Sequence, residues 1–287
     1  RVLFPDDIYH GTRALVKGEF TRWGLKAGFL DFTDLAAVER TLKESPVRLV
    51  WLETPSNPRL KIADLTAIAK LARSSGALVV ADNTWATPIL TRPLSLGAHV
   101  SMHSTTKYIG GHSDVLGGAL VFGADAPPEW VTRVRDWQKL GGAVTAPFDS
   151  WLLLRSLATL PIRVRAASET AAKLASWLAA HPKVERVNYP GLPSHPGHTI
   201  ALHQMASGGA MMSFEVRGGF DAARGVAGRL KLITRATSLG GVESLIEHRK
   251  PIEGPDSPTP DNLLRFSVGL ENVDDLLADL EQALAQG

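Results

Sequence analysis

The 287-residue sequence contains no cysteine. This absence excludes disulfide bonds, thiolate metal sites and a cysteine nucleophile, and it leaves the cytoplasm as the default location to expect. Long apolar runs are missing as well, because none approaches the roughly 18 residues of a membrane-spanning helix. The sequence also has no excess of one charge, since 31 Lys and Arg residues stand against 29 Asp and Glu residues. Nucleic acid and membrane surfaces are therefore not expected as partners.

What the sequence does contain is apolar material for a large core, with 44% of its residues hydrophobic. From about residue 15 to residue 122, helical stretches alternate with short, β-branched apolar runs. This alternation is typical of βαβ units and predicts a mostly parallel sheet. Apolar spacing predicts a helix over residues 64–75, which Gly76 ends. Strands are predicted at residues 48–52, 77–81, 99–103 and 118–122.

The second half of the chain has a different pattern. An alanine-rich helix is predicted over residues 166–180, after Pro161, followed by strands at residues 210–216 and 264–268 and by an amphipathic final helix with Leu276, Leu277, Leu280 and Leu284. The segment 250–261 contains four prolines and is predicted to be a surface loop. We therefore expect two domains, a large one over residues 1–151 and a smaller α+β domain over residues 152–287.

Hydroxyl groups surround Lys107 directly after the predicted strand at residues 99–103. Ser104 and Thr106 precede the lysine by three residues and by one residue, and could bind a phosphate group. A lysine amine becomes nucleophilic toward aldehydes when partial burial lowers its pKa. The cluster therefore indicates a phosphorylated aldehyde bound to Lys107, although a surface lysine beside turn hydroxyls would have the same sequence.

Two further polar residues follow predicted strands. Asp82 stands at the carboxyl end of a buried apolar strand, where ligands bind in open α/β sheets, and a carboxylate there can pair with a protonated ring nitrogen. The same residue could equally be a helix cap or a metal ligand. Asn57 lies in a loop between two prolines and could hydrogen-bond a ring substituent, or could simply form a turn.

The order and spacing of these motifs resemble those of the Cys/Met-metabolism family of enzymes that use pyridoxal 5′-phosphate. The matching segments are residues 53–58, 82–84, 104–114, 189–196, 238–244 and 264–271, so the resemblance covers essentially the whole chain. It implies a type I aminotransferase-like α/β fold, with the cofactor in the large domain. It also implies a homotetramer, a dimer of dimers whose active sites are shared across each dimer.

The resemblance assigns most candidate residues to the cofactor. Lys107 is implied to form the Schiff base and Asp82 to pair with the pyridine nitrogen. Ser104 and Thr106 match the phosphate-binding residues. Tyr9 matches the tyrosine that stacks on the cofactor ring and takes part in proton transfer, and Asn57 matches the residue that contacts the ring hydroxyl.

The remaining candidates are implied to bind the substrate. Arg265 matches the arginine that binds the substrate α-carboxylate, a task for which the planar guanidinium is suited. Ser238 matches the serine near the lysine amine, and Thr237 occupies the specificity position before it. Several γ-acting relatives have glutamate at that position and β-lyases often have tyrosine, so Thr237 matches neither group.

The reaction implied is elimination or replacement at Cβ or Cγ of a sulfur-containing or O-acylated amino acid. We expect trans-sulfuration of the cystathionine γ-lyase type, with γ-replacement of the cystathionine γ-synthase or O-acylhomoserine sulfhydrylase type as the alternative. Family members also have a long preceding segment with a phosphate-binding loop and a Tyr/Arg pair that reaches the neighbouring cofactor. No part of this sequence matches it, so we expect that segment to be missing.

Two other classes of enzyme can be drawn from the same residues. Ser104 to Lys107 fit the S-x-x-K pattern of serine acyl-transfer enzymes, but the companion S-D-N and K-T-G motifs are absent. A metal hydrolase could use one of two sets of histidines, either His99, His103 and His112 or His195, His198 and His203. Neither set has the H-E-x-x-H spacing, so no metal is expected.

Overall fold

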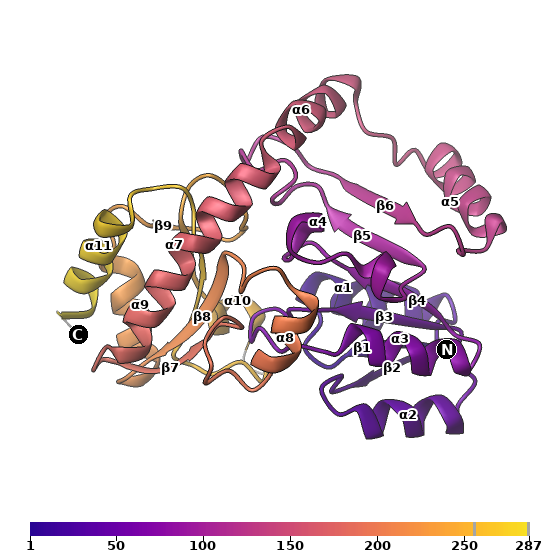
Figure 1. The fold of residues 1–287 in the computed structure, drawn as a ribbon, viewed down its shortest axis with the longest axis horizontal. Helices are drawn as coiled ribbons and strands as arrows, with labels where there is room; N and C mark the ends of the chain where they lie inside the picture. The colour runs from indigo at the N-terminus through magenta and orange to yellow at the C-terminus, as the bar shows by residue number, and fades with distance from the viewer. Residues whose placement is uncertain (255–256, 286–287) are drawn as a thin grey trace. The chain divides into compact units, whose positions relative to one another are not determined.

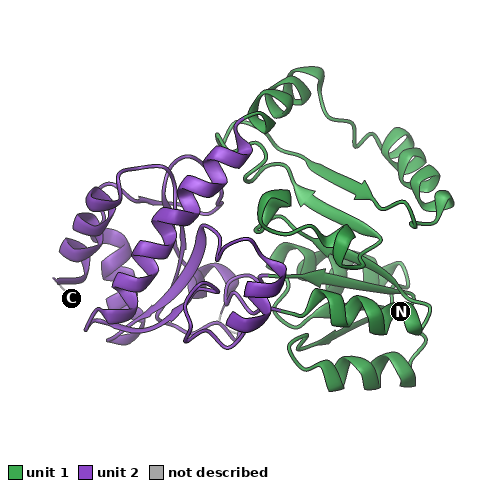
Figure 2. Ribbon diagram, viewed as in Figure 1, with its two compact units in different colours: residues 1–54, 63–158 green, residues 55–62, 159–287 purple. Residues whose placement is uncertain are grey.

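The computed structural model describes residues 1–254 and 257–285, which form the α/β architecture drawn in Figure 1. The chain divides into two compact units (Figure 2). Unit 1 comprises Arg1–Thr54 and Ala63–Ala158, and unit 2 comprises Pro55–Ile62 and the chain from Thr159 onward. The domain boundary predicted after residue 151 falls inside helix α6 (Pro147–Leu157) and stays a prediction. Within the described ranges, no helix has both the length and the apolar sequence needed to cross a bilayer.

Unit 1 contains a six-stranded sheet in the order β2-β1-β3-β4-β5-β6. Its strands are β1 (Val2–Pro5), β2 (Ala27–Leu30), β3 (Leu49–Glu53), β4 (Leu78–Asp82), β5 (Val100–Ser104) and β6 (Gly118–Phe122). All neighbouring strands run parallel except β5 and β6. The mostly parallel sheet is therefore confirmed, although β1 and β2, with four residues each, are not predicted from the sequence.

Alternation along the strands gives the sheet of unit 1 two apolar faces, as expected for a parallel sheet covered on both sides. Leu3 and Val50 face one side, where α2 (Leu35–Glu44) and α3 (Leu65–Ser74) pack. Phe4 faces the other side, where Ile8 and Val16 bury it near α1 (His10–Leu15) and the π-helix η1 (Val16–Phe20). The carboxyl ends of the strands therefore lead into loops fixed by helices on both faces.

The rest of unit 1 consists of short and peripheral helices. These are α4 (Thr87–Leu90), the 3₁₀-helix η2 (Pro93–Leu96), α5 (Pro128–Gly141) and α6. In Figure 1, α5 and α6 follow the antiparallel edge strand β6. No residue of α5 is buried within the described chain.

Unit 2 contains a five-stranded sheet in the order β7-β8-β11-β10-β9. Its strands are β7 (Val184–Asn188), β8 (Met211–Val216), β9 (Thr234–Arg235), β10 (Leu245–His248) and β11 (Leu263–Ser267). Three helices bury one face of this sheet in an apolar core: α7 (Leu160–Ala180), α9 (Gly219–Arg229) and α11 (Val273–Ala285). The predicted strands at residues 210–216 and 264–268 and the final helix are confirmed.

Two predictions about unit 2 need correction. Helix α7 begins at Leu160, six residues before the predicted start, because Pro161 is tolerated in a first turn, where its missing N–H has no partner to lose. The proline-rich segment is not entirely a loop, since Arg249–Glu253 form α10, with Pro251 inside that single turn. Pro255 of the same segment lies outside the described residues. The remaining helix of unit 2 is α8 (His198–Gln204).

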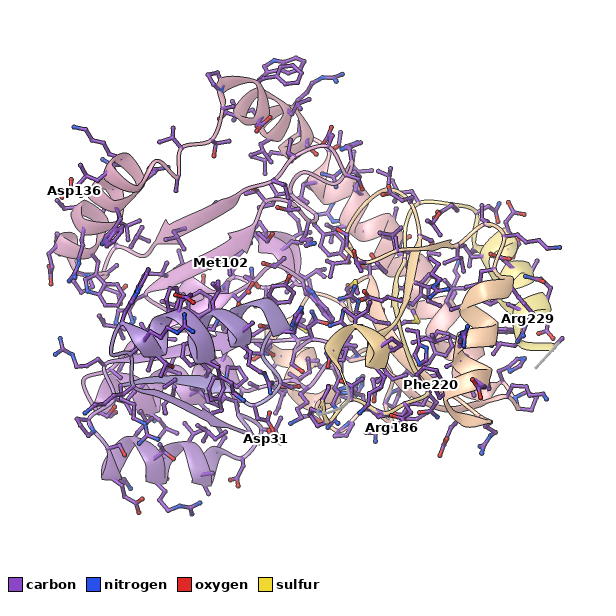
Figure 3. All side chains as sticks on the ribbon, turned by 180° about the vertical axis from the view of Figure 1, so that it is seen from behind. Asp31, Met102, Asp136, Arg186, Phe220 and Arg229 are labelled. Carbon is purple, nitrogen blue, oxygen red and sulfur yellow. The ribbon has the colours of Figure 1, made fainter. Side chains whose placement is uncertain are left out.

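A buried carboxylate joins the helices of unit 2 to the start of β9. Asp279 of α11 accepts the backbone N–H groups of Lys231, Leu232 and Ile233 at 2.8–2.9 Å. Burial alone would raise the pKa of Asp279, but these N–H groups favour the charged form and lower it. Arg229, labelled in Figure 3, adds a hydrogen bond from its Nε to the Ala283 carbonyl.

We expect Asp279→Ala to lower the free energy of unfolding by about 2–4 kcal/mol, because three backbone N–H groups, one of them buried, lose a charged acceptor. Since folding lowers the pKa of Asp279, its contribution is present above the pKa of the unfolded state and is lost as the pH falls through the folded pKa. Urea unfolding at neutral and acidic pH measures both effects. The exposed Asp275→Ala change in the same helix serves as the control and should cost less than about 1 kcal/mol.

Candidate active site

Two carboxyl groups end neighbouring strands of unit 1. Asp82 is the last residue of β4 and pairs in register with Glu53, the last residue of β3. The Asp82 side chain accepts the backbone N–H of Thr84 at 3.0 Å. Burial raises the pKa of Asp82, and the hydrogen bonds from Thr84 oppose this only in part. The structure thus places Asp82 at the strand end where the sequence predicts it.

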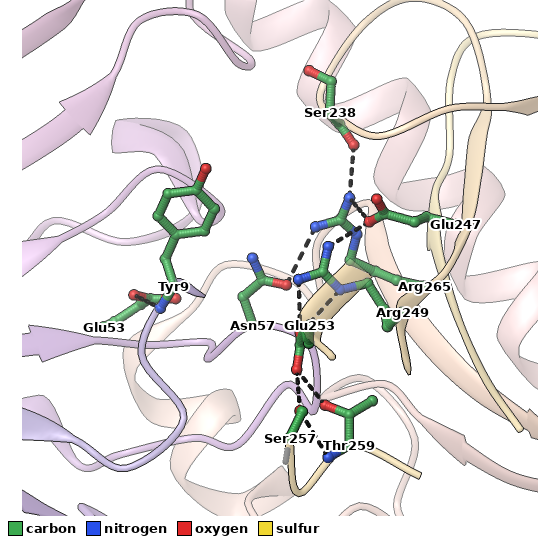
Figure 4. A network of polar contacts seen from close by, with 10 residues as sticks. All are labelled: Tyr9, Glu53, Asn57, Ser238, Glu247, Arg249, Glu253, Ser257, Thr259 and Arg265. Carbon is green, nitrogen blue, oxygen red and sulfur yellow. Dashed lines mark hydrogen bonds and ion pairs between the residues drawn. The ribbon is translucent and has the colours of Figure 1, made fainter. Parts of the chain in front are cut away.

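Glu53 is a site residue that the sequence analysis did not single out. Its carboxyl group is buried, and Oε2 accepts the backbone N–H of Tyr9 at 2.9 Å (Figure 4). Burial raises the pKa of Glu53 well above its usual value, and the negative charge of Asp82 raises it further. The signal that could have found it is its position at the carboxyl end of an apolar strand, the same rule that selected Asp82.

Thr84 connects Asp82 to the next strand. Its Oγ1 accepts the backbone N–H of Ser104 at 2.9 Å, while its own N–H donates to Asp82. Beside it, the N–H of Asn83 donates to the carbonyl of Met102, a residue of β5 labelled in Figure 3. The end of β4 is therefore fixed to the end of β5, and the positions of Asp82 and Ser104 depend on each other.

Lys107 lies in the turn that follows β5 and is half-buried. Its N–H donates to the Ser104 carbonyl at 3.2 Å, and its carbonyl accepts the N–H of Gly111 at 2.7 Å. Gly110 is required here, because a Cβ would lie 2.8 Å from the carbonyl oxygen of Thr105. The turn therefore holds the backbone of Lys107 at the carboxyl end of β5, in the position predicted for it.

Thr106, predicted to bind phosphate, is hydrogen-bonded within this turn. Its Oγ1 accepts the N–H of Gly117 at 3.0 Å and contacts the Gly117 carbonyl at 3.3 Å. Neighbouring Thr105 has a buried Oγ1 with no hydrogen-bond partner among the residues that the structure describes. A Cβ on Gly117 would lie 2.7 Å from that hydroxyl. Both threonine hydroxyls thus face the backbone just before β6.

Tyr9 precedes α1 and presents an exposed ring, with 47% of its surface accessible. The hydrogen bond from its N–H to Glu53 fixes its backbone. A Cβ at residue 11 would lie 2.6 Å from the ring, so Gly11 allows the ring to lie over the backbone. An exposed aromatic face on a fixed backbone suits stacking on a planar ligand.

The residues of unit 1 fit the predicted cofactor. In the part of the chain that the structure describes, no Lys, Arg or His side chain forms an ion pair with Asp82. Burial disfavours its negative charge and raises its pKa. A protonated pyridine nitrogen is a cation of the shape and charge that would satisfy this carboxylate. Tyr9, Lys107 and Ser104 offer kinds of group that such a cofactor binds, namely an aromatic face, an amine and a hydroxyl. The Thr106 hydroxyl is hydrogen-bonded within its own turn.

Unit 2 contains the predicted substrate arginine in a buried polar network (Figure 4). Arg265 of β11 is only 4% exposed. Its Nη2 lies 2.7 Å from Glu247 and donates to the Ser238 carbonyl at 3.0 Å, and its Nη1 donates to Asn57 at 3.3 Å. The structure therefore brings together Arg265, Asn57 and Ser238, three residues far apart in the sequence. Glu247 is a further member that the sequence analysis did not single out.

Ser238 has a left-handed backbone, with φ of 67°, which is uncommon for a residue other than glycine. The hydrogen bond from Arg265 to its carbonyl, together with that from the N–H of Gly240 to Ser267, fixes this turn to β11. Thr237 and Ser238 are both exposed between β9 and β10. Strain held by contacts to a strand is typical of functional turns.

The histidines of the alternative metal sites have structural contacts. His99 Nδ1 accepts the N–H of Val79, and His195 Nδ1 accepts the N–H of Gly197, each at 3.0 Å. Burial lowers the pKa of His195 to about 4, which keeps the ring neutral. Across the described ranges, no three His, Asp or Glu side chains gather into a group that could hold a metal ion.

We expect Glu53→Gln to make the stability of the protein without added cofactor less dependent on pH. Folding raises the pKa of Glu53, so its favourable contribution is complete below the unfolded value of about 4.5 and is lost as the pH rises through the folded pKa. Each unit by which folding shifts the pKa of Glu53 corresponds to about 1.4 kcal/mol of stability that depends on pH, and the glutamine variant lacks this dependence. The glutamine oxygen still accepts the N–H of Tyr9. Unfolding between pH 4 and pH 8 tests this, with exposed Glu44→Gln as the control, and equal pH slopes in all three proteins would contradict it.

Comparison with known proteins places this geometry in a family. The model of the family described as Cys/Met metabolism PLP-dependent enzyme matches residues 1–285. The chain is 49% identical over 288 residues to a cystathionine gamma-synthase of Mycobacterium tuberculosis H37Rv, covering 99% of this chain and 73% of that protein. It is 44% identical to a cystathionine gamma-lyase of Dictyostelium discoideum, covering 99% of this chain and 74% of that one.

A solved structure agrees with these relatives. The cystathionine gamma synthase of Xanthomonas oryzae pv. oryzae in complex with cystathionine superimposes with a TM-score of 0.94 at 40% identity. The match covers 99% of this chain and 75% of that one. The type I aminotransferase-like fold, the cofactor and the class of reaction expected from the sequence are thereby confirmed. The chain belongs to the Cys/Met metabolism family of enzymes that depend on pyridoxal phosphate.

Proposed function

We propose that this protein catalyses γ-replacement of the cystathionine γ-synthase type, in which a thiol such as cysteine replaces the acyloxy group on Cγ of an O-acylated homoserine, and that group leaves as a carboxylate. The observation that carries this choice is the 49% identity to mycobacterial cystathionine gamma-synthases over 99% of the chain. Cleavage of the γ-lyase type, which the sequence analysis favoured, is the second candidate, supported by the 44% identity to the Dictyostelium enzyme.

Residues of unit 1 would hold and polarise the cofactor. We assign its covalent attachment to the Nζ of Lys107, its ring nitrogen to Asp82, its phosphate to Ser104 and Thr106, and stacking on its ring to Tyr9. When bound, pyridoxal phosphate supplies an electron-withdrawing ring that stabilises negative charge on the substrate α-carbon. Since burial and Asp82 both raise the pKa of Glu53, a protonated Glu53 would leave Asp82 as the charge that meets the ring nitrogen.

The same chain would bind the substrate and move its protons. Arg265 would bind the α-carboxylate, Asn57 would contact the ring hydroxyl, and Ser238 with Thr237 would border the reacting side chain. The Nζ of Lys107 would take the α-proton, because an amine beside the substrate α-carbon can act as a general base. Tyr9 would serve as a second group for proton transfer. The cytoplasmic location stays a prediction.

Product analysis distinguishes the two reactions. We expect protein loaded with cofactor to form cystathionine from an O-acylhomoserine and cysteine faster than it releases ammonia and an oxo acid from cystathionine. Lys107→Ala should reduce either reaction by about 10²- to 10⁴-fold, because it removes the general base, and should abolish retention of cofactor absorbance during dialysis. Faster cystathionine cleavage would select the γ-lyase reaction. Failure of the wild-type protein to take up the cofactor would contradict both.

We further propose that the chain assembles as a homotetramer whose contacts include α5 and α6. Five large apolar side chains of these helices are at least half exposed within the described chain: Trp137, Leu140, Phe148, Trp151 and Leu154. Phe148 and Trp151 stack with centroids 5.8 Å apart, which forms a continuous aromatic surface. Apolar surfaces of this kind mark protein interfaces.

Sedimentation measurements test the assembly. Introducing charges by Trp151→Glu with Leu154→Glu should shift the protein to smaller species, because a charge in an apolar interface loses its hydration. Leu202→Glu, on exposed α8 of unit 2, serves as the control and should leave the assembly unchanged. A monomeric wild-type protein would contradict the proposal.

A further inference from the structure

A row of buried polar side chains crosses the sheet of unit 2 on the face opposite the apolar core. Register places Asn188 beside Ser213, Ser213 beside Arg265, and Arg265 beside Glu247. None of the four residues is more than 6% exposed. Because successive strand residues point to opposite faces, the neighbours of this row, such as Phe214 and Phe266, enter the apolar core. Arg265 is thus enclosed by polar groups of its own sheet.

Glu247 holds two guanidinium groups on one oxygen atom. Its Oε2 lies 2.7 Å from Nη2 of Arg265 and 2.5 Å from Nη1 of Arg249. Its Oε1 is buried and has no hydrogen-bond partner among the described residues. Both contacts are short ion pairs shielded from solvent, and the one with Arg249 is also a charged hydrogen bond, which is strong and directional in such surroundings. The orientation of the Arg265 guanidinium therefore depends on Glu247.

Arg249 is fixed in turn by Glu253 at the end of α10. Its Nη2 and Nε lie 2.7 and 3.1 Å from Glu253 Oε1. Burial would raise the pKa of Glu253, but the hydroxyls of Ser257 and Thr259 and the charge of Arg249 lower it. Two arginines and two glutamates make a formal charge of zero for this cluster.

We propose that Glu247 and Arg249 are positioning residues, which orient Arg265 and balance the charge around it so that it can bind the substrate α-carboxylate. The inference rests on the proposed function, in which Arg265 binds that group. Glu247 fixes the plane of the Arg265 guanidinium. Arg249 balances the charge of Glu247, so that a further carboxylate can approach Arg265 without meeting a net negative cluster. Loss of Arg249 would leave a net charge of −1, and loss of both Arg249 and the charge of Glu247 would return it to zero.

A double-mutant cycle tests the inference on protein loaded with cofactor. Calorimetry measures the dissociation constants of L-alanine and of L-alaninamide, which lacks the carboxylate, for Arg249→Met, Glu247→Gln and the double variant. We expect Arg249→Met to raise the dissociation constant of L-alanine by about 10- to 100-fold and that of L-alaninamide by less than about 3-fold. The double variant should recover most of the loss for L-alanine, because it restores neutrality. If both substitutions only damaged the structure, their changes in binding free energy would add in the double variant. The binding of both ligands would then be weakened alike.

Further variants keep the outcome decisive. Arg249→Lys retains the charge and should bind L-alanine within about 3-fold of the wild type, so a loss equal to that of Arg249→Met would overturn the inference. Lys250→Met, in the same helix, serves as the matched control and should leave both constants unchanged. Arg265→Lys tests the underlying proposal separately. If it weakens L-alanine and L-alaninamide equally, Arg265 does not bind the carboxylate. If it is selective while the cycle is additive, only the inference about Glu247 and Arg249 fails.

Discussion

Adjacent ends of parallel strands bring two carboxyl groups together in unit 1, and the organisation of its polar loops depends on that pairing. Glu53 and Asp82 are register neighbours that are removed from solvent, so both cannot ionise without a large electrostatic cost. Each carboxyl group accepts one backbone hydrogen bond, Glu53 from the N–H of Tyr9 and Asp82 from the N–H of Thr84. The carboxyl edge of the sheet is thus prepared for one cationic group.

Unit 2 contains a buried arginine, Arg265, within its sheet. Alternation sends Phe266 into the apolar core and Arg265 to the opposite face, where Glu247 meets it across the strand pair. An isolated buried guanidinium would be costly, whereas one bonded to a carboxylate, a carbonyl and an amide is stable. The same contacts that stabilise the fold also determine which way the guanidinium points.

The membership of the family explains why the two units have such different polar chemistry. An enzyme that uses pyridoxal phosphate must provide a site for an aromatic cation with a phosphate, and separately a site for the carboxylate of an amino acid. Asp82, Tyr9 and Lys107 lie in unit 1 and suit the first task. Arg265 lies in unit 2 and suits the second, and Asn57, which hydrogen-bonds it, comes from the segment Pro55–Ile62, between two parts of unit 1 in the sequence.

The sequence alone determined the strand-helix alternation, the position of Asp82 at a strand end and the lysine turn at Lys107, because these depend on local periodicity and on glycines in fixed places. It could not reveal Glu53 as a partner of Tyr9, or Glu247 and Arg249 as partners of Arg265. Those contacts join residues 44 and 18 positions apart, or place two arginines on one oxygen. Only tertiary structure decides them, because strand register determines which buried charges meet.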